Sequence, residues 1–170
     1  MDDSLDRRPT HTPAEDGAMP YIFPDRKCSN CERFDGALAY APIVQSELMV
    51  AFINERQRSR GALVVAPRRH ILTLEEMTNA ERKEMARVVA QVAAGVRDSL
   101  KPDGVHHFCN AGEPAGQSEP HLHVQIVPRY ADAEYGFGPS DDIPLTSLSE
   151  QMRIAHAIAV ALNPLPEGEQ

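Results

Sequence analysis

The sequence predicts an α+β domain in which a mainly antiparallel sheet is crossed by one long helix and followed by a C-terminal helix. Three observations carry this prediction. Polar and apolar residues alternate over 121–127, two short apolar runs over 47–52 and 61–65 flank a polar turn, and a segment of helical periodicity follows Thr78. A chain of 170 residues, 42% hydrophobic and 25% charged, is long enough for one such domain with a proper core.

The overall composition excludes several classes of protein. A formal net charge of −8 argues against a general nucleic-acid binder, although a small nucleotide still fits a locally basic pocket or one lined by N–H groups. No apolar run approaches about 18 residues, and the N-terminal segment lacks the apolar core of a secretory signal. Three cysteines, an odd number, do not suggest a disulfide framework. We therefore expect a cytoplasmic protein without membrane or nucleic-acid partners.

The chain divides into three parts by composition. Residues 1–20 are polar and interrupted by prolines, so we expect a disordered or loosely attached tail. The main domain is expected over 21–140. Residues 141–170 are expected to form a C-terminal helical extension.

A C-x-x-C motif formed by Cys28 and Cys31 opens the main domain. It is half of a zinc site, a redox pair or a coincidence. The redox interpretation requires a thioredoxin-like βαβ context, which does not follow in the sequence. A structural zinc site needs two further ligands, and the sequence offers His70 and His121.

The two apolar runs that follow are predicted to pair as a β-hairpin. Residues 47–52 and 61–65 are strand-like, and the polar residues 54–58 connect them. Three arginines in or beside the turn are interpreted as solvated surface residues, with contact to a substrate phosphate as the alternative: Arg56, Arg58 and Arg60.

The clearest helix begins at the capping box formed by Thr78 and Glu81. Its apolar residues recur at steps of three and four, and the sequence 101–104 (KPDG) ends it. We expect this helix to lie across the apolar side of the sheet as scaffold. A short strand over 105–109 follows, in which the adjacent His106 and His107 point to opposite faces.

The segment from Asn110 to Arg129 carries the chemistry. A glycine-rich turn allows backbone N–H groups to approach an anion, because glycine lacks the Cβ that would block a phosphate. The strand after it is predicted to project His121, His123 and Gln125 from one face, with apolar residues on the other. An imidazole held at a phosphate can attack phosphorus and form a covalent phosphoramidate.

This segment resembles the signature of the histidine-triad (HIT) superfamily, His-φ-His-φ-His-φ-φ, with Gln125 in place of the third His. The motifs N-x-G at 110–112 and A-G-Q-S at 115–118 resemble the family's phosphate loop, and 127–129 resembles its strand exit. Weaker resemblance extends back to Cys28. It implies a HIT-like fold with a five-stranded sheet, and a homodimer that acts on a nucleotide or a dinucleoside polyphosphate.

The resemblance implies a role for individual residues. His123 would attack the α-phosphorus of a nucleotide and carry a nucleotidyl-His intermediate. Phe52 falls where the family places an aromatic against the base. Asn54 falls where an acidic residue holds the ribose hydroxyls, so an acceptor is kept but a charge-assisted bond is lost. Donors for the phosphoryl oxygens are implied at Asn110, Gly116, Gln117 and Ser118.

The metal-bearing branch of the superfamily, which includes sugar-1-phosphate nucleotidylyltransferases, implies a structural zinc ion held by Cys28, Cys31, His70 and His121. The alternative is an entry loop without metal, in which His70 lies near the active site by packing alone.

Gln125 affects the choice of leaving group, because an amide cannot deliver a proton near neutral pH. We therefore expect the enzyme to prefer leaving groups that depart as stable anions. Chain length favours the small hydrolases of the family, whereas Gln at this place is typical of its transferases and phosphorylases. Both activities stay open at this point, and the rival classes are a non-catalytic HIT-fold nucleotide binder and a small zinc-dependent interaction module.

A second capping box, Ser147 to Glu150, is predicted to open the C-terminal helix. Its apolar residues fall on one side, and the helix would cover either the active site or a dimer partner.

Overall fold

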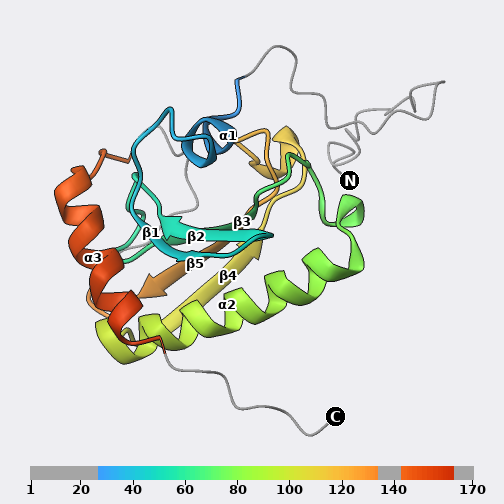
Figure 1. Cartoon of the computed structure of the whole chain (residues 1–170). Coiled ribbons are helices and arrows are strands. Elements are labelled where there is room, and N and C mark those ends of the chain that lie inside the picture. The colour runs from blue at the N-terminus through green and yellow to red at the C-terminus, as the bar shows by residue number, and fades with distance from the viewer. Residues whose placement is uncertain (1–26, 134–142, 163–170) are drawn as a thin grey trace, which may run out of the picture.

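The computed structural model describes residues 27–133 and 143–162 (Figure 1). The tail expected over 1–20 lies outside these residues. The helices are α1 (Ser29–Phe34), α2 (Asn79–Leu100) and α3 (Leu148–Val160), with 3₁₀ turns η1 (Leu74–Glu76) and η2 (Glu113–Ala115). The strands are β1 (Pro42–Gln45), β2 (Met49–Ile53), β3 (Leu63–Pro67), β4 (Gly104–Cys109) and β5 (Val124–Arg129).

The five strands form one antiparallel sheet in the order β1-β2-β3-β5-β4, which confirms the predicted α+β class. The predicted hairpin is β2–β3, with Ala51 opposite Val65. β1 was not anticipated from the sequence. β5 begins only at Val124, so the strand expected over 121–127 was placed too early. The ladder with β3 ends at the Val65–Val124 pair, and Leu122 N donates instead to Ile71 O at 2.6 Å.

The main core lies between the sheet and α2, which runs along one face of the sheet (Figure 1). The helix buries Val88, Val92 and Val96 completely against sheet residues such as Ile126. A smaller cluster lies on the opposite face, where Phe34 of α1 packs on β2 and β3. Successive side chains of β2 and β3 point to opposite faces of the sheet, so they contribute alternately to the main core and to the smaller cluster. α2 therefore covers one face of the sheet, and Phe34 of α1 packs on the β2–β3 part of the other face.

α3 packs into the same main core and contacts α2, β1 and β2. Its inward residues Ile154 and Ile158 are buried, and α2 approaches it closely at Gly95, where a Cβ would lie 3.2 Å from the Ile158 backbone oxygen. Only half of the expected capping box forms: the Ser147 side chain accepts from Glu150 N, whereas the Glu150 carboxylate pairs with Arg153.

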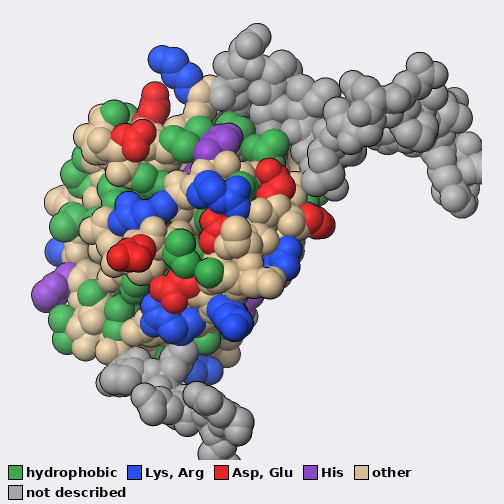
Figure 2. Space-filling view, turned by 45° about the vertical axis from the view of Figure 1, so that its right-hand side comes forward, with side chains coloured by type: hydrophobic (Ala, Val, Ile, Leu, Met, Phe, Trp, Pro, Cys, Tyr) green, Lys and Arg blue, Asp and Glu red, His purple; other side chains and the backbone are tan. Residues whose placement is uncertain are grey.

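Charged side chains of both signs are interspersed on the described part of the face that Figure 2 shows. None of the helices in the described ranges is long and apolar enough to cross a membrane.

The capping box of α2 is joined to the connection that follows β3. Thr78 and Glu81 exchange backbone-to-side-chain bonds, and Arg69 donates to both carboxylate oxygens of Glu81 at 3.0 and 2.8 Å. The Glu81 side chain is only 5% exposed. These donors, Arg69 above all, hold the pKa of Glu81 at about 2, against an ordinary 4.5. The ion pair therefore fixes the start of α2 against the segment that carries His70.

We predict that Glu81→Gln lowers the free energy of unfolding by about 1–3 kcal/mol at pH 7, the range for hydrogen bonds to charged groups. Because the folded pKa of Glu81 is depressed, its contribution is complete above pH ~5 and is lost as the pH falls towards 2. Urea unfolding of both proteins between pH 7 and 3 measures the difference.

The control is Glu84→Gln, which breaks a more exposed pair with Arg87 on the same helix and should cost at most about 1 kcal/mol. A difference between wild type and Glu81→Gln that stays constant with pH would contradict the assignment.

Candidate active site and the adjoining Cys–His cluster

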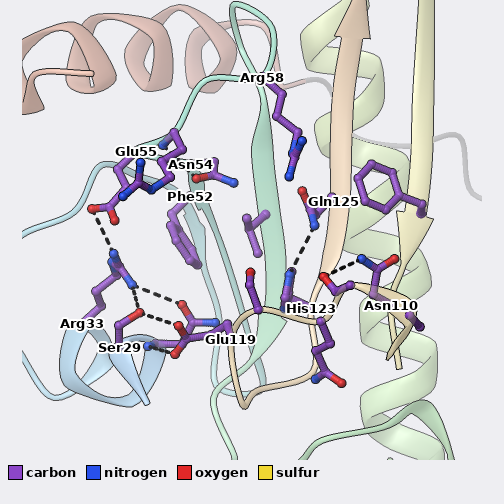
Figure 3. Close-up of a pocket in the computed structure, with 18 of the residues that line it drawn as sticks. Ser29, Arg33, Phe52, Asn54, Glu55, Arg58, Asn110, Glu119, His123 and Gln125 are labelled. Atoms are coloured by element: carbon purple, nitrogen blue, oxygen red, sulfur yellow. Dashed lines mark hydrogen bonds and ion pairs between the residues drawn. The ribbon is translucent and has the colours of Figure 1, made fainter. Parts of the chain in front are cut away.

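A cleft of about 1020 Å³ opens between α1, the end of β2, the loop after β4 and the start of β5 (Figure 3). All eight residues that the sequence assigned to catalysis and substrate binding line it: Phe52, Asn54, Asn110, Gly116, Gln117, Ser118, His123 and Gln125. They come from three separate segments, the end of β2, the loop after β4 and the start of β5, which the β2–β3–β5–β4 order brings close together.

His123 is held in one orientation at the floor of this cleft. Its Nδ1 lies 2.8 Å from the backbone oxygen of His121, and because a carbonyl only accepts, Nδ1 carries the hydrogen. The other nitrogen, Nε2, therefore carries a lone pair, and it lies 3.5 Å from Nε2 of Gln125. Burial lowers the pKa of His123 below its ordinary 6.5. The geometry is that of a neutral imidazole with a fixed tautomer.

The loop of residues 110–119 is shaped by hydrogen bonds within the protein. Gly116 adopts φ +82°, which favours glycine, and its oxygen accepts from Asn110 Nδ2 at 2.9 Å. The Gln117 side chain is buried: Oε1 accepts from Gly112 N at 2.6 Å and Nε2 donates to Leu72 O at 3.1 Å. Gln117 therefore uses its amide to hold the loop, which differs from the phosphate donor expected from the sequence.

The other end of the cleft is an aromatic wall. Phe52 is buried and packs edge-to-face against Phe34 and Tyr40, at ring-centroid distances of 6.0 and 5.6 Å. Asn54 lies beside it and accepts from Arg56 N through Oδ1 at 3.0 Å. This bond uses one acceptor site of the amide oxygen and leaves the amide NH₂ as a donor group on the side chain.

α1 adds residues that the sequence analysis missed. Arg33 lies over Phe52, 5.9 Å from the ring centroid, and pairs with Glu55 at 3.1 Å. Glu119 accepts from the Ser29 hydroxyl at 2.9 Å, so α1 is tied directly to the loop that leads to His121. Figure 3 shows these residues along one side of the cleft. For Ser29 and Arg33 the only sequence signal was their closeness to the C-x-x-C motif.

Cys28, Cys31, His70 and His121 converge behind this wall, with one ligand atom of each within 4.8 Å of all the others. Sγ of Cys28 lies 3.2 Å from Nδ1 of His121, and Sγ of Cys31 lies 3.3 Å from Nδ1 of His70. A tetrahedral zinc ion with two sulfur and two nitrogen ligands requires separations of about 3.3–3.8 Å between these atoms. The donor set therefore fits zinc, and the shortest sulfur–nitrogen separations lie close to this range.

The orientation of His121 suits metal coordination. Its Nε2 donates to Pro67 O at 2.8 Å, which directs the Nδ1 lone pair towards the two sulfur atoms. Burial lowers the pKa of His121 to about 4, so the ring is neutral. Burial also raises the pKa of the Cys28 thiol to about 12, a change that a bound cation reverses. All three cysteines are free thiols.

The other residues that the sequence analysis considered for a role lie partly inside the cleft and partly outside it. Arg56 and Arg58 line it, whereas Arg60 is exposed outside it. His106 and His107 lie on β4 and do not line it.

Comparison with known proteins gives consistent results. The family model described as "HIT domain" matches residues 40–132. "Protein hit" of Bacillus subtilis is 34% identical over 111 residues, which cover 65% of this chain and 76% of that protein. "AP-4-A phosphorylase" of Mycobacterium tuberculosis is 30% identical over 95 residues, and the match spans 55% of this chain but only 49% of that enzyme. A crystal structure of a "ZN-bound histidine triad family protein" from Mycobacterium smegmatis superposes with a TM-score of 0.66 at 25% identity, covering 79% of this chain and 92% of that one.

The role of Gln117 is testable. We predict that Gln117→Leu lowers the free energy of unfolding by about 2–4 kcal/mol, because it leaves Gly112 N and Leu72 O without their buried partner. The matched control is Gln125→Leu in the same cleft, which should change stability by less than about 0.5 kcal/mol. Denaturant unfolding measures both. Equal stability of Gln117→Leu and wild type would show that the loop does not depend on this side chain.

Proposed function

Because the chain belongs to the HIT domain family, we propose that it is an enzyme that cleaves a phosphoanhydride or phosphoramidate at the α-phosphorus of a nucleotide through a covalent nucleotidyl-His123 intermediate. The observation that carries this proposal is the state of His123: Nδ1–H is fixed on the His121 carbonyl, and Nε2 presents a lone pair in the cleft. A neutral imidazole of fixed tautomer is a ready nucleophile.

In the first step, the Nε2 lone pair of His123 forms a bond to the α-phosphorus, and the bond to the leaving group breaks with its electron pair on the departing atom. In the second step an acceptor oxygen attacks the same phosphorus, the P–N bond breaks, and its electron pair returns to Nε2. The acceptor's proton is released to solvent. Positioning and electrostatic stabilisation supply most of the catalysis of phosphoryl-transfer reactions.

Different walls of the cleft would bind different parts of the substrate. Phe52 offers a flat apolar surface to the base, held in place by its aromatic neighbours, and Asn54 lies where it can bind the ribose hydroxyls. Asn110, Gly116 and Ser118 also line the cleft and would surround the α-phosphate. In this arrangement Gln117 acts by holding the loop in shape.

Gln125 can donate a hydrogen bond to a phosphoryl oxygen but not a proton to a leaving group. This property favours anionic leaving groups and is compatible with hydrolysis or with transfer to phosphate or another acceptor. The relative named AP-4-A phosphorylase supports a dinucleoside polyphosphate as the substrate class. The enzyme is a HIT-family hydrolase or a nucleotidyltransferase of the phosphorylase type. A non-catalytic nucleotide binder is the weaker alternative, because the orientation of His123 would then have no use.

We also propose that Cys28, Cys31, His70 and His121 hold a structural zinc ion, because their donor set fits and their ligand atoms converge. Bound there, zinc would cross-link the start of α1 to the ends of β3 and of the 110–121 loop. We further propose a homodimer, by resemblance to the family.

We predict that mixing the protein with diadenosine tetraphosphate gives a transient adduct of one nucleotidyl group, detected by intact-protein mass spectrometry. His123→Ala should abolish the adduct and lower turnover at least about 10³-fold while nucleotide binding persists, because the nucleophile alone is lost. His156→Ala, an exposed histidine on α3, should behave as wild type. An adduct that survives in His123→Ala would refute the assignment.

We predict close to one zinc per chain by elemental analysis after gentle purification. Cys31→Ser should lose most of the zinc and lower the melting temperature, because structural zinc contributes directly to folding. Cys109→Ser, which removes the one cysteine outside the cluster, should keep it. Less than about 0.2 zinc per wild-type chain would exclude the site.

A further inference from the structure

The side of the cleft beyond His123 is lined by Arg58, to which the mechanism above assigns no role. Arg58 lines both the main cleft and a second recess of about 340 Å³. This recess lies between residues 58–60, at the β2–β3 connection, and residues 129–133, after β5. Figure 3 shows the Arg58 side chain directed towards Gln125, which itself lies next to His123. The recess is thus a neighbour of the nucleophile and shares one wall residue with its cleft.

The charge of this region is opposite to that of the whole chain. The protein carries a formal net charge of −8, yet the recess contains three basic residues against one acidic residue: Arg58, Arg60, Arg129 and Asp132. Among the described residues that line the recess, basic residues therefore outnumber acidic ones, and such an excess favours anions.

The order of residues along the cleft assigns this side to the leaving group. The aromatic wall at Phe52 suits a base, the loop at Gly116 suits the α-phosphate, and Gln125 separates His123 from Arg58 (Figure 3). A substrate placed in this way directs the rest of its phosphate chain towards Arg58. A guanidinium binds phosphate through two parallel N–H groups and stays charged at any working pH.

We propose that Arg58 is a specificity-determining residue that selects a polyanionic leaving group, and that the recess with Arg60 and Arg129 receives its distal phosphates. This inference rests on the proposed function. When His123 Nε2 bonds to the α-phosphorus, the bond to the bridging oxygen breaks and its electron pair remains on the departing phosphate. Arg58 stabilises that added charge, so no proton is needed from Gln125. An amine leaving group gains nothing from Arg58, and it takes its proton from solvent because Gln125 does not supply one.

Binding measurements test the assignment without turnover. Isothermal titration of the full chain compares AMP with α,β-methylene-ATP, which cannot be cleaved at the α-phosphorus. Arg58→Gln should weaken binding of α,β-methylene-ATP about 10- to 100-fold and leave AMP binding within about twofold. The affinity of Arg58→Lys for α,β-methylene-ATP should lie between those of wild type and Arg58→Gln. The lysine ammonium keeps the charge but lacks the two parallel N–H groups of the guanidinium. Arg87→Gln, an equal change of charge on the exposed face of α2, should bind both probes as wild type does.

Kinetics provide the second readout. Diadenosine tetraphosphate and adenosine 5′-phosphoramidate share the same nucleoside and α-phosphorus but differ in leaving group. Arg58→Gln should lower kcat/KM at least about tenfold for the first and less than about twofold for the second. Equal losses for both substrates, or equal weakening of AMP and α,β-methylene-ATP, would overturn the assignment, since Arg58 would then be merely structural.

The proposed enzyme activity and the proposed polyanion site can be refuted separately. Absence of any turnover by the wild type, with the difference between AMP and α,β-methylene-ATP still dependent on Arg58, would refute the enzyme and support the polyanion site. Turnover that is unaffected by Arg58→Gln for either substrate would keep the enzyme and refute the polyanion site.

Discussion

Three contacts of one buried residue, His121, fix the relation between the sheet, α1 and the nucleophile. Its Nε2 donates to Pro67 at the end of β3, its Nδ1 faces the sulfur atoms of Cys28 and Cys31, and its carbonyl accepts from Nδ1 of His123. Because all three contacts come from one residue, displacement of α1 or of β3 would be transmitted to His123. The nucleophile is aimed by the same backbone segment that closes the Cys–His cluster.

The cleft has two ends of different character. At one end, Phe52 is packed among aromatic rings and Arg33 is paired with Glu55, so this wall is rigid and electrically balanced. At the other, Arg58 leads into a recess with an excess of basic residues. Under the proposed chemistry, the first arrangement would hold the part of the substrate that remains on the enzyme, and the second would receive the part that departs as an anion. A chain with a net charge of −8 could then bind an anionic substrate, because Arg58, Arg60 and Arg129 line the recess in which the leaving group would lie.

Local patterns in the sequence predicted the α+β class, and the resemblance to a known family pointed to eight of the residues that line the cleft. The capping box at Thr78, the β2–β3 hairpin and the alternation around His123 each depend on residues close in the chain. β1 escaped prediction because it has only four residues and its register is interrupted at Pro42–Val44. Glu119 joins the site through contacts with Ser29 and Asn30, about 90 residues away in the chain, and Arg33 joins it through Phe52 and Glu55 of the β2 end. No local sequence pattern indicates such contacts. For the same reason the sequence could not show that the Gln117 amide is already occupied inside the loop.

The position of α3 has a consequence for biosynthesis. Ile154 and Ile158 complete the core against α2, β1 and β2, although these strands lie about a hundred residues earlier in the chain. During translation the part of this apolar surface that α3 covers therefore stays exposed until residues 148–160 have emerged from the ribosome. A nascent chain in this condition is prone to non-native association. Among the described helices, α3 is thus the one whose arrival completes the burial of this apolar surface.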